Sequence, residues 1–301
     1  MISKDGKTIV VIGATGRQGG AVLRHLVKDG WRVRALTRTP ESKKAANLKP
    51  LGAEVVRADM NEKSSLETIF RNAYGVFNMQ PPVPGKIEVE IQQGRNVAEA
   101  AREAGIQHIV YGSAGPGHTK TGIEQWDSKI EIAGVMKDLG LPLTILRPMA
   151  FMELMTDPTY YPQSSTWYIW PRLTGTNRKI PWLSVQDLGA IAAKAFADPD
   201  TYLGKDLPLA ADARTLDEIR EIYKQVTGKY PSRFPMPMFL FEKFVGKDIP
   251  NMWRWLASNP VSLDTGPAHA VHPQAMDVPT WLGSVTSPAR SARLKRDVPN
   301  A

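Results

Sequence analysis

Three glycines follow the first apolar segment of the chain at a spacing suited to holding a phosphate group. They are Gly13, Gly16 and Gly19 in the run VVIGATGRQGGAVL. A residue without Cβ lets the backbone turn tightly and approach a pyrophosphate closely, and the N-terminus of the following helix offers unpaired N–H groups. We therefore expect a dinucleotide site, and the alternative is an ordinary tight turn. Its expected contacts are Gly13, Thr15, Gly16, Arg17, Gln18 and Gly19.

The second expected strand, residues 31–40, ends in Thr-Arg-Thr-Pro, with no acidic residue at its end. An acid at this place accepts from the ribose 2′-hydroxyl of NAD, whereas an arginine suits the 2′-phosphate of NADP. Arg38 stands there, and Lys43 and Lys44 follow closely. We therefore expect NADP(H), contacted by Arg38 and Lys43. A solvated basic loop is the alternative.

Further polar residues stand where later strands end. Asp59 and Met60 close the expected strand 53–60, and Asn78 and Gln80 lie at the end of strand 73–82. Asp59 is suited to accept a hydrogen bond from the adenine amino group. The carboxyl ends of parallel strands form the edge at which open α/β sheets bind ligands. We expect all four residues to contact the cofactor.

The elements that must position these residues alternate between strand and helix. Short apolar runs at 7–13, 107–114 and 143–148 join the strands named above, and the expected helices include 16–30 and 87–104. The first helix carries an apolar stripe of Val22, Leu23, Leu26 and Val27 and ends at Gly30. Such alternation predicts an α/β fold with a parallel sheet and right-handed crossovers.

Composition excludes several other classes of protein. The 301 residues include no cysteine, which excludes disulfides, thiolate zinc sites and a cysteine nucleophile. The histidines are scattered, so no metal site is expected. We see no signal peptide and no apolar run long enough to span a membrane, and we expect a cytoplasmic protein. Part of the net charge of +8 comes from residues 286–301. We expect this segment to be a basic flexible tail that contacts neither nucleic acid nor a membrane.

Several motifs together resemble the NmrA-like family of atypical short-chain dehydrogenases/reductases. They are GATGRQGG, LTRTP, GAEVVRADM, HIVYGSA, WDSK and LTILRPMAFME, followed by SVQDLGAIAAKAFADPDTYLGKDLPLAAD, NMWRWL and HPQAMDVPTWL. The resemblance covers nearly the whole chain to about Gly283. It implies a Rossmann-type doubly wound parallel sheet with a smaller C-terminal α/β lobe, and it implies NADP(H) as cofactor.

The resemblance also implies which residues to test for catalysis. A typical short-chain dehydrogenase carries a Tyr-x-x-x-Lys pair, and the matching stretch here is Gln125-Trp-Asp-Ser-Lys129. The lysine is present, but a glutamine replaces the tyrosine, and glutamine cannot act as a proton acid at neutral pH. Lys129 is expected to contact the nicotinamide ribose. Ser113 matches the substrate-orienting serine, and Gln125 can hydrogen-bond a carbonyl.

The C-terminal lobe is rich in aromatic residues and methionine, which form either its core or an apolar pocket. Phe151, Met152 and Met155 directly follow the sixth strand, so we expect them to line a substrate pocket. Tyr111 and His118 are candidate proton donors in that pocket; the alternatives are a core position for Tyr111 and a surface-loop position for His118. The expected division is residues 1–150 and 182–212 for the NADP-binding domain, and 151–181 and 213–285 for the substrate or partner lobe.

Two functions follow from these residues together with the resemblance, which implies either an NADPH-dependent reductase or an NADP(H)-binding regulator of a partner. The retained Lys129 and Ser113 favour an NADPH-dependent reductase of a conjugated or quinone-like small molecule. Such an acceptor takes its proton from water, whereas a simple ketone needs the missing acid. The absent tyrosine favours instead a catalytically silent NADP(H) sensor that regulates a protein partner. A homodimer is compatible with either function.

Overall fold

The structure is a computed structural model that describes residues 2–83, 85–117, 119–160 and 162–286. The described residues divide into two compact units, which are treated separately below. The N-terminal unit comprises Met1–Pro148, Val185–Pro208 and Ala270–His272, and the second unit contains the rest. His118 and the tail residues 287–301 lie outside the described residues.

A seven-stranded sheet forms the centre of the N-terminal unit, in the order β3-β2-β1-β4-β5-β6-β9. Strands β1 to β6 pair in parallel with their neighbours in this order. The sequence-based prediction of an α/β fold with a parallel sheet is therefore confirmed. The strands are β1 (Thr8–Val11), β2 (Arg32–Thr37), β3 (Glu54–Arg57), β4 (Gly75–Asn78), β5 (His108–Gly112), β6 (Leu143–Pro148) and β9 (Asp206–Leu209).

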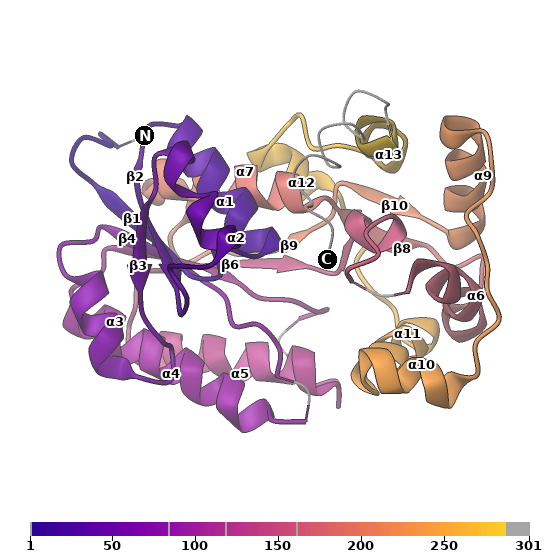
Figure 1. Cartoon of the computed structure of the whole chain (residues 1–301), viewed down its shortest axis with the longest axis horizontal. Helices are drawn as coiled ribbons and strands as arrows, with labels where there is room; N and C mark the ends of the chain where they lie inside the picture. Colours follow the sequence, from indigo (N-terminus) through magenta and orange to yellow (C-terminus); the bar gives the residue numbers. More distant parts are fainter. Residues whose placement is uncertain (1, 84, 118, 161, 287–301) are drawn as a thin grey trace. The chain divides into compact units, whose positions relative to one another are not determined.

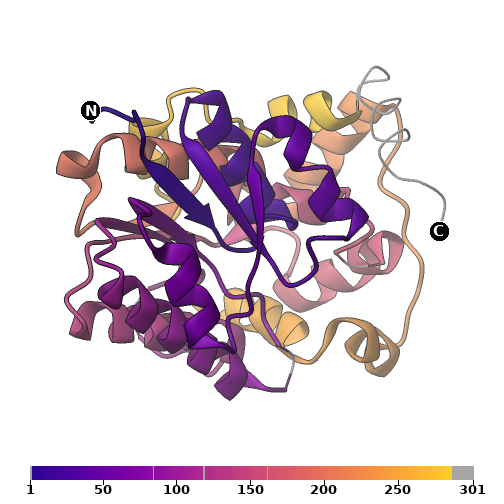
Figure 2. The ribbon, with the colours of Figure 1, turned by 60° about the vertical axis from the view of Figure 1, so that its left-hand side comes forward.

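Helices cover both faces of this sheet. Figure 1 shows α1 and α7 on one side and α3, α4 and α5 on the other, and Figure 2 shows the same layers turned by 60°. The helices are α1 (Arg17–Lys28), α2 (Lys43–Ala46), α3 (Lys63–Phe70), α4 (Ile87–Glu103), α5 (Glu124–Asp138), α7 (Val185–Ala197) and α8 (Pro199–Tyr202), with a 3₁₀ turn η1 (Lys49–Leu51).

The core between the sheet and α3, α4 and α5 is continuous and apolar. It joins strand residues such as Val10, Val76 and Ile109 to helix residues such as Val97 and Ile132. On the opposite face, Val22, Leu23 and Leu26 of α1 are buried, as the apolar stripe in the sequence predicts. Burial on both faces explains why the strands read as nearly continuous apolar runs.

The second unit contains a small three-stranded sheet in the order β10-β8-β7, with a core of tryptophans. Trp170 packs against Trp167, Trp182 and Trp253, with ring centroids 5.6, 5.3 and 4.4 Å away. Its elements are β7 (Ala150–Phe151), η2 (Met152–Met155), α6 (Gln163–Thr174), β8 (Ile180–Leu183), β10 (Asp212–Arg214), α9 (Leu216–Thr227), α10 (Met238–Val245), α11 (Asp248–Ser258) and α13 (Val278–Thr286). Helix α12 (Gly266–Val271) has residues in both units.

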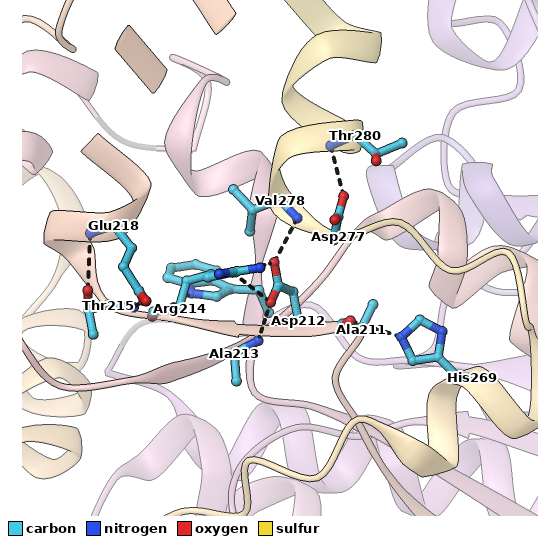
Figure 3. Close-up of polar contacts among 11 residues, drawn as sticks. Ala211, Asp212, Ala213, Arg214, Thr215, Glu218, His269, Asp277, Val278 and Thr280 are labelled. Atoms are coloured by element: carbon cyan, nitrogen blue, oxygen red, sulfur yellow. Dashed lines mark hydrogen bonds and ion pairs between the residues drawn. The ribbon is translucent and has the colours of Figure 1, made fainter. Parts of the chain in front are cut away.

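The carboxylate of Asp212 ties α13 to this small sheet (Figure 3). It accepts hydrogen bonds from the backbone N–H groups of Ala213 at 2.8 Å and Val278 at 3.0 Å, and from Nε of Arg214. The Val278 N–H is the first of α13, so Asp212 satisfies a helix end that would otherwise be unpaired. Among the helices of the described ranges, none is long and apolar enough to cross a bilayer.

The imidazole of His108 is buried in the N-terminal unit. Its Nε2 lies 2.9 Å from Thr144 Oγ1, whose hydroxyl donates to the carbonyl of Tyr202 at 2.7 Å. The Thr144 oxygen is therefore left to accept from Nε2–H. Burial lowers the pKa of His108 to about 4. The ring is thus neutral in the folded protein at pH values where a solvated histidine takes up a proton.

We expect this histidine to make folding pH-dependent. Between pH 6.5 and 4, His108 is protonated in the unfolded chain but stays neutral in the folded protein. The free energy of unfolding should therefore fall by roughly 3 kcal/mol as the pH drops through this range. His108→Gln keeps an N–H donor for Thr144 and should lose this part of the pH dependence. Urea unfolding at intervals across this range measures both proteins. Equal pH dependence in the two would contradict the assignment.

Candidate functional site

A cavity of about 550 Å³ opens at the carboxyl edge of the seven-stranded sheet, within the N-terminal unit. It lies where the strand order reverses, because β2 and β3 extend on one side of β1 and β4 on the other. Open α/β sheets bind ligands at such a reversal. The cavity is lined by Ile12, Gly13, Thr15, residues 36–39, 58–60 and 81–83, and Gln93.

The predicted glycine turn forms one wall of this cavity. Gly13 has φ +71°, a conformation that L side chains rarely adopt, and the N–H of Gly16 donates to its carbonyl at 2.8 Å. A Cβ at Gly19 would lie 2.4 Å from the same carbonyl oxygen, so only glycine fits there. Helix α1 begins at Arg17, and its first N–H groups have no partner within the helix. The turn therefore brings several backbone donors to the edge of the cavity.

The end of β2 forms a second, basic wall. Arg38 and Thr39 are exposed there, and Thr37 is buried beneath them. Arg57 of β3 holds this segment, because its guanidinium donates to the carbonyl of Arg38 at 3.2 Å and pairs with Glu41. Lys43 lies on α2 and is not among the residues that line the cavity. Arg38 is thus the cation at this wall.

Asp59 and Met60 lie at the end of β3 and line the cavity as well. Asp59 Oδ1 accepts from the backbone N–H and the side-chain amide of Asn61, at 2.9 and 2.8 Å. The Met60 carbonyl accepts from Asn96 of α4 at 2.8 Å. The position of the Asp59 carboxylate is thus held by its own loop, and α4 holds that loop.

Gln93 of α4 lines the cavity and was not predicted from the sequence. Its amide donates to Asn61 at 3.1 Å, while its buried Oε1 has no hydrogen-bond partner among the described residues. The same holds for the buried Oε1 atoms of Gln18 and Gln80. Gln93 stands three residues after Glu90, where an amphipathic helix would carry apolar side chains. Polar residues at core positions were therefore the signal that could have identified it.

Lys129 lies in a second, buried cluster that also contains Gln80. Its ammonium donates to the Gln80 carbonyl at 2.8 Å and pairs with Glu90 of α4. Ser128 donates to the same Glu90 oxygen at 2.8 Å. Burial lowers the pKa of Lys129, and the charge of Glu90 opposes that shift. Asn78 belongs to this cluster too, because its Oδ1 accepts from the Gln80 amide at 2.6 Å.

The other residues proposed for catalysis lie on β5 and at the start of α5. Ser113 directly follows β5 and is buried, and its N–H donates to the Leu146 carbonyl at 2.9 Å. Gln125 lies in the first turn of α5, one turn before Lys129, and is partly exposed. Tyr111 is fully buried in the core, and burial and the charge of Glu90 raise its pKa well above the ordinary value. Its phenol is therefore neutral.

The residues predicted for a substrate pocket do not all lie in one unit. Tyr111 belongs to the N-terminal unit, whereas Phe151, Met152 and Met155 belong to the second. Met152 and Met155 are buried, and the Met155 carbonyl accepts from the Trp167 indole at 3.2 Å. Phe151 is half-buried, and His118 lies outside the described residues. Their role in binding a substrate stays a prediction.

We expect the glycine turn to tolerate no side chain at Gly19. Gly19→Ala forces a methyl group onto the Gly13 carbonyl and should lower the free energy of unfolding by about 1–3 kcal/mol. Gly134→Ala in α5 is the matched control, because a Cβ added at this position would have no atom within 4 Å. That variant should gain roughly 0.5–1 kcal/mol. Denaturant unfolding of both variants is the measurement, and equal stabilities would contradict the close approach.

Comparison with known proteins agrees with this architecture. The sequence model of the NmrA-like family matches residues 5–271 of this chain. The NmrA-like family domain-containing oxidoreductase FrzB of Cladobotryum sp is 32% identical over 249 residues, which are 73% of this chain and 74% of that protein.

Two solved structures share the fold at lower identity. The triphenylmethane reductase of Citrobacter sp., complexed with NADP(H), has a TM-score of 0.75 at 19% identity, covering 92% of this chain and 99% of that one. The negative transcriptional regulator NmrA, in complex with NADP, has a TM-score of 0.73 at 19% identity, covering 95% and 97%. The family match over most of the chain, together with the identity to FrzB, shows that this protein belongs to the NmrA-like family.

Proposed function

We propose that this chain is an NADPH-dependent reductase that delivers hydride to a conjugated or quinone-like small molecule. The observation that carries the proposal is the cavity at the strand reversal, with the glycine turn on one side and Arg38 on another. A cavity of about 550 Å³ has the size of a small-molecule site. The buried cation Lys129, near the same edge of the sheet, supports a reductase.

The residues around the cavity fit the adenosine half of NADP(H). The backbone of Gly13 and Gly16 and the first turn of α1 would hold the pyrophosphate. Arg38, with the hydroxyl of Thr39, would hold the 2′-phosphate, since a guanidinium binds phosphate oxygens through two parallel hydrogen bonds. Asp59 would accept from the adenine amino group. The unpartnered Oε1 of Gln93, which lines the cavity, is a buried acceptor that a bound ligand can satisfy.

Lys129 would serve the nicotinamide half. An ammonium has three N–H donors, and Glu90 and the Gln80 carbonyl accept from it in the structure. A further donor is suited to a ribose hydroxyl. The bound cofactor would supply a hydride, and the protein would supply its position and a dry, electrostatically fixed surrounding.

The absent acid limits the class of acceptor. Gln125 stands where a typical short-chain dehydrogenase has its tyrosine, and an amide cannot donate a proton to a developing alkoxide. A quinone or an extended conjugated acceptor forms a more stable anion and takes its proton from water. The relatives are in keeping with this choice, because FrzB is named an oxidoreductase and the Citrobacter protein a triphenylmethane reductase.

A second function is an NADP(H)-sensing regulator that acts through a protein partner. Gln125 favours it, since a sensor needs no proton donor. The NADP complex of the transcriptional regulator NmrA supports it as well. The two functions share the cofactor site and differ in whether NADPH is consumed.

We expect Arg38 to set the preference for NADPH over NADH. Hydrogen bonds to a charged group contribute about 1.5–3 kcal/mol, so Arg38→Gln should weaken NADPH binding roughly 10- to 100-fold and leave NADH binding nearly unchanged. Fluorescence titration with both cofactors measures this. Lys49→Gln, an exposed lysine outside the cavity, is the control and should match the wild type. Unchanged NADPH affinity in Arg38→Gln would disprove the assignment of Arg38.

Turnover separates the two functions. NADPH oxidation is followed with quinones, conjugated aldehydes and triarylmethane dyes, and Lys129→Ala should reduce kcat at least 100-fold, about 3 kcal/mol of barrier. Lys137→Ala, an exposed lysine on the same helix α5, should match the wild type. Tight NADPH binding with no turnover of any acceptor would instead support the regulator.

A further inference from the structure

The buried ion pair between Glu90 and Lys129 needs an explanation beyond packing. Glu90 is 2% exposed and Lys129 is 7% exposed. Removing two charges from water is unfavourable, and a buried pair is often no more stable than apolar residues of the same volume. Apolar side chains would therefore fill this place between α4 and α5 equally well. The presence of the ion pair therefore indicates that a charged group is needed at this position for function.

The packing of the two helices brings the pair together. A Cβ at Gly94 of α4 would lie 2.5 Å from the Ile132 side chain of α5, so a glycine is needed for this close approach. Glu90 stands one turn before Gly94, and Lys129 stands about one turn before Ile132. The contact thus places the carboxylate beside the ammonium, and Ser128 adds a hydrogen bond of 2.8 Å to the same carboxylate oxygen.

The pair also fixes where the ammonium points. Lys129 donates to the Gln80 carbonyl at 2.8 Å, in the loop that follows β4. The next residues of that loop, Pro81, Pro82 and Val83, line the cavity. Glu90 on one side and Gln80 on the other therefore hold the ammonium beside the loop that borders the candidate cofactor site.

We propose that Glu90 is a positioning residue for the reaction: it keeps Lys129 charged and holds its ammonium against the Gln80 carbonyl, so that a remaining N–H donor can meet the nicotinamide ribose. This inference rests on the proposed function. In this proposal Glu90 acts through Lys129, with which it pairs, and not by contacting cofactor or acceptor itself. Among the described residues, the buried Tyr111 of β5 also interacts electrostatically with Glu90, and its phenol stays neutral.

The sign of the effect follows from the electrostatics. Burial lowers the pKa of Lys129, and the charge of Glu90 raises it. Without that charge the ammonium loses its proton at a lower pH. An opposite charge at contact distance typically shifts a titration by 1–3 pH units. The expected change is therefore a downward shift of this size.

The test compares Glu90→Gln, which keeps the volume and removes the charge, with Glu88→Gln, an exposed glutamate of the same helix. The ¹³Cε resonance of Lys129 in lysine-labelled protein, without cofactor, reports its protonation. We expect the titration to move down by about 1–3 pH units in Glu90→Gln and to stay unchanged in Glu88→Gln. The pH above which NADPH binding weakens should be lower in Glu90→Gln than in the wild type. The pH above which kcat declines should be lower by a similar amount.

A merely structural role for Glu90 would lower thermal stability and leave the Lys129 titration in place, which would overturn the inference. A shifted titration with unaltered NADPH affinity and turnover across the pH range would overturn it as well. Glu90→Asp keeps the charge at a shorter reach and should shift the titration less than glutamine does, so it decides the question if Glu90→Gln does not fold. Wild-type protein that binds no NADPH would contradict the proposed function itself.

Discussion

The reversal of strand order at β1 is the constraint on which the candidate site depends. The chain places β2 and β3 on one side of β1 and returns to place β4 on the other. The segments that follow β1 and β4 therefore diverge and leave a space at the carboxyl edge. Gly13 and the loop residues Pro81 and Pro82 border that space. No side chain has to create the cavity, because the topology of the sheet does so.

The two cations of the candidate site are held by different physical means. Arg38 is exposed at the end of β2, and its backbone is fixed by Arg57 of the neighbouring strand. A charge exposed to water is stable without a counter-ion, so the Arg38 guanidinium is available to bind an anionic ligand. Lys129 is buried, so it is paired with Glu90 and bound to a backbone carbonyl. Burial makes the second cation dependent on its surroundings, whereas the first depends mainly on where its strand ends.

The part of the site that could be predicted from sequence is the part that follows directly along the chain from a strand. Gly13, Arg38 and Asp59 come within a few residues of β1, β2 and β3, and all three line the cavity. Lys43 lies a few residues farther along the chain, on α2, and is not among the lining residues, so its contact with the cofactor stays a prediction. Local order along the chain thus predicts the lining of the cavity for the first residues after each strand.

The sequence by itself determined the alternation of strands and helices, the glycine turn and the basic end of β2, because apolar periodicity and the absence of a Cβ act within a few residues. The resemblance to short-chain dehydrogenases identified Lys129 as a candidate. Only the tertiary structure decided that Glu90 pairs with this lysine and that Gln93 reaches the cavity. Both lie on α4, far along the chain from their partners. Their positions follow from the packing of α4 against α5 and the sheet, and no local pattern encodes which buried polar group meets which.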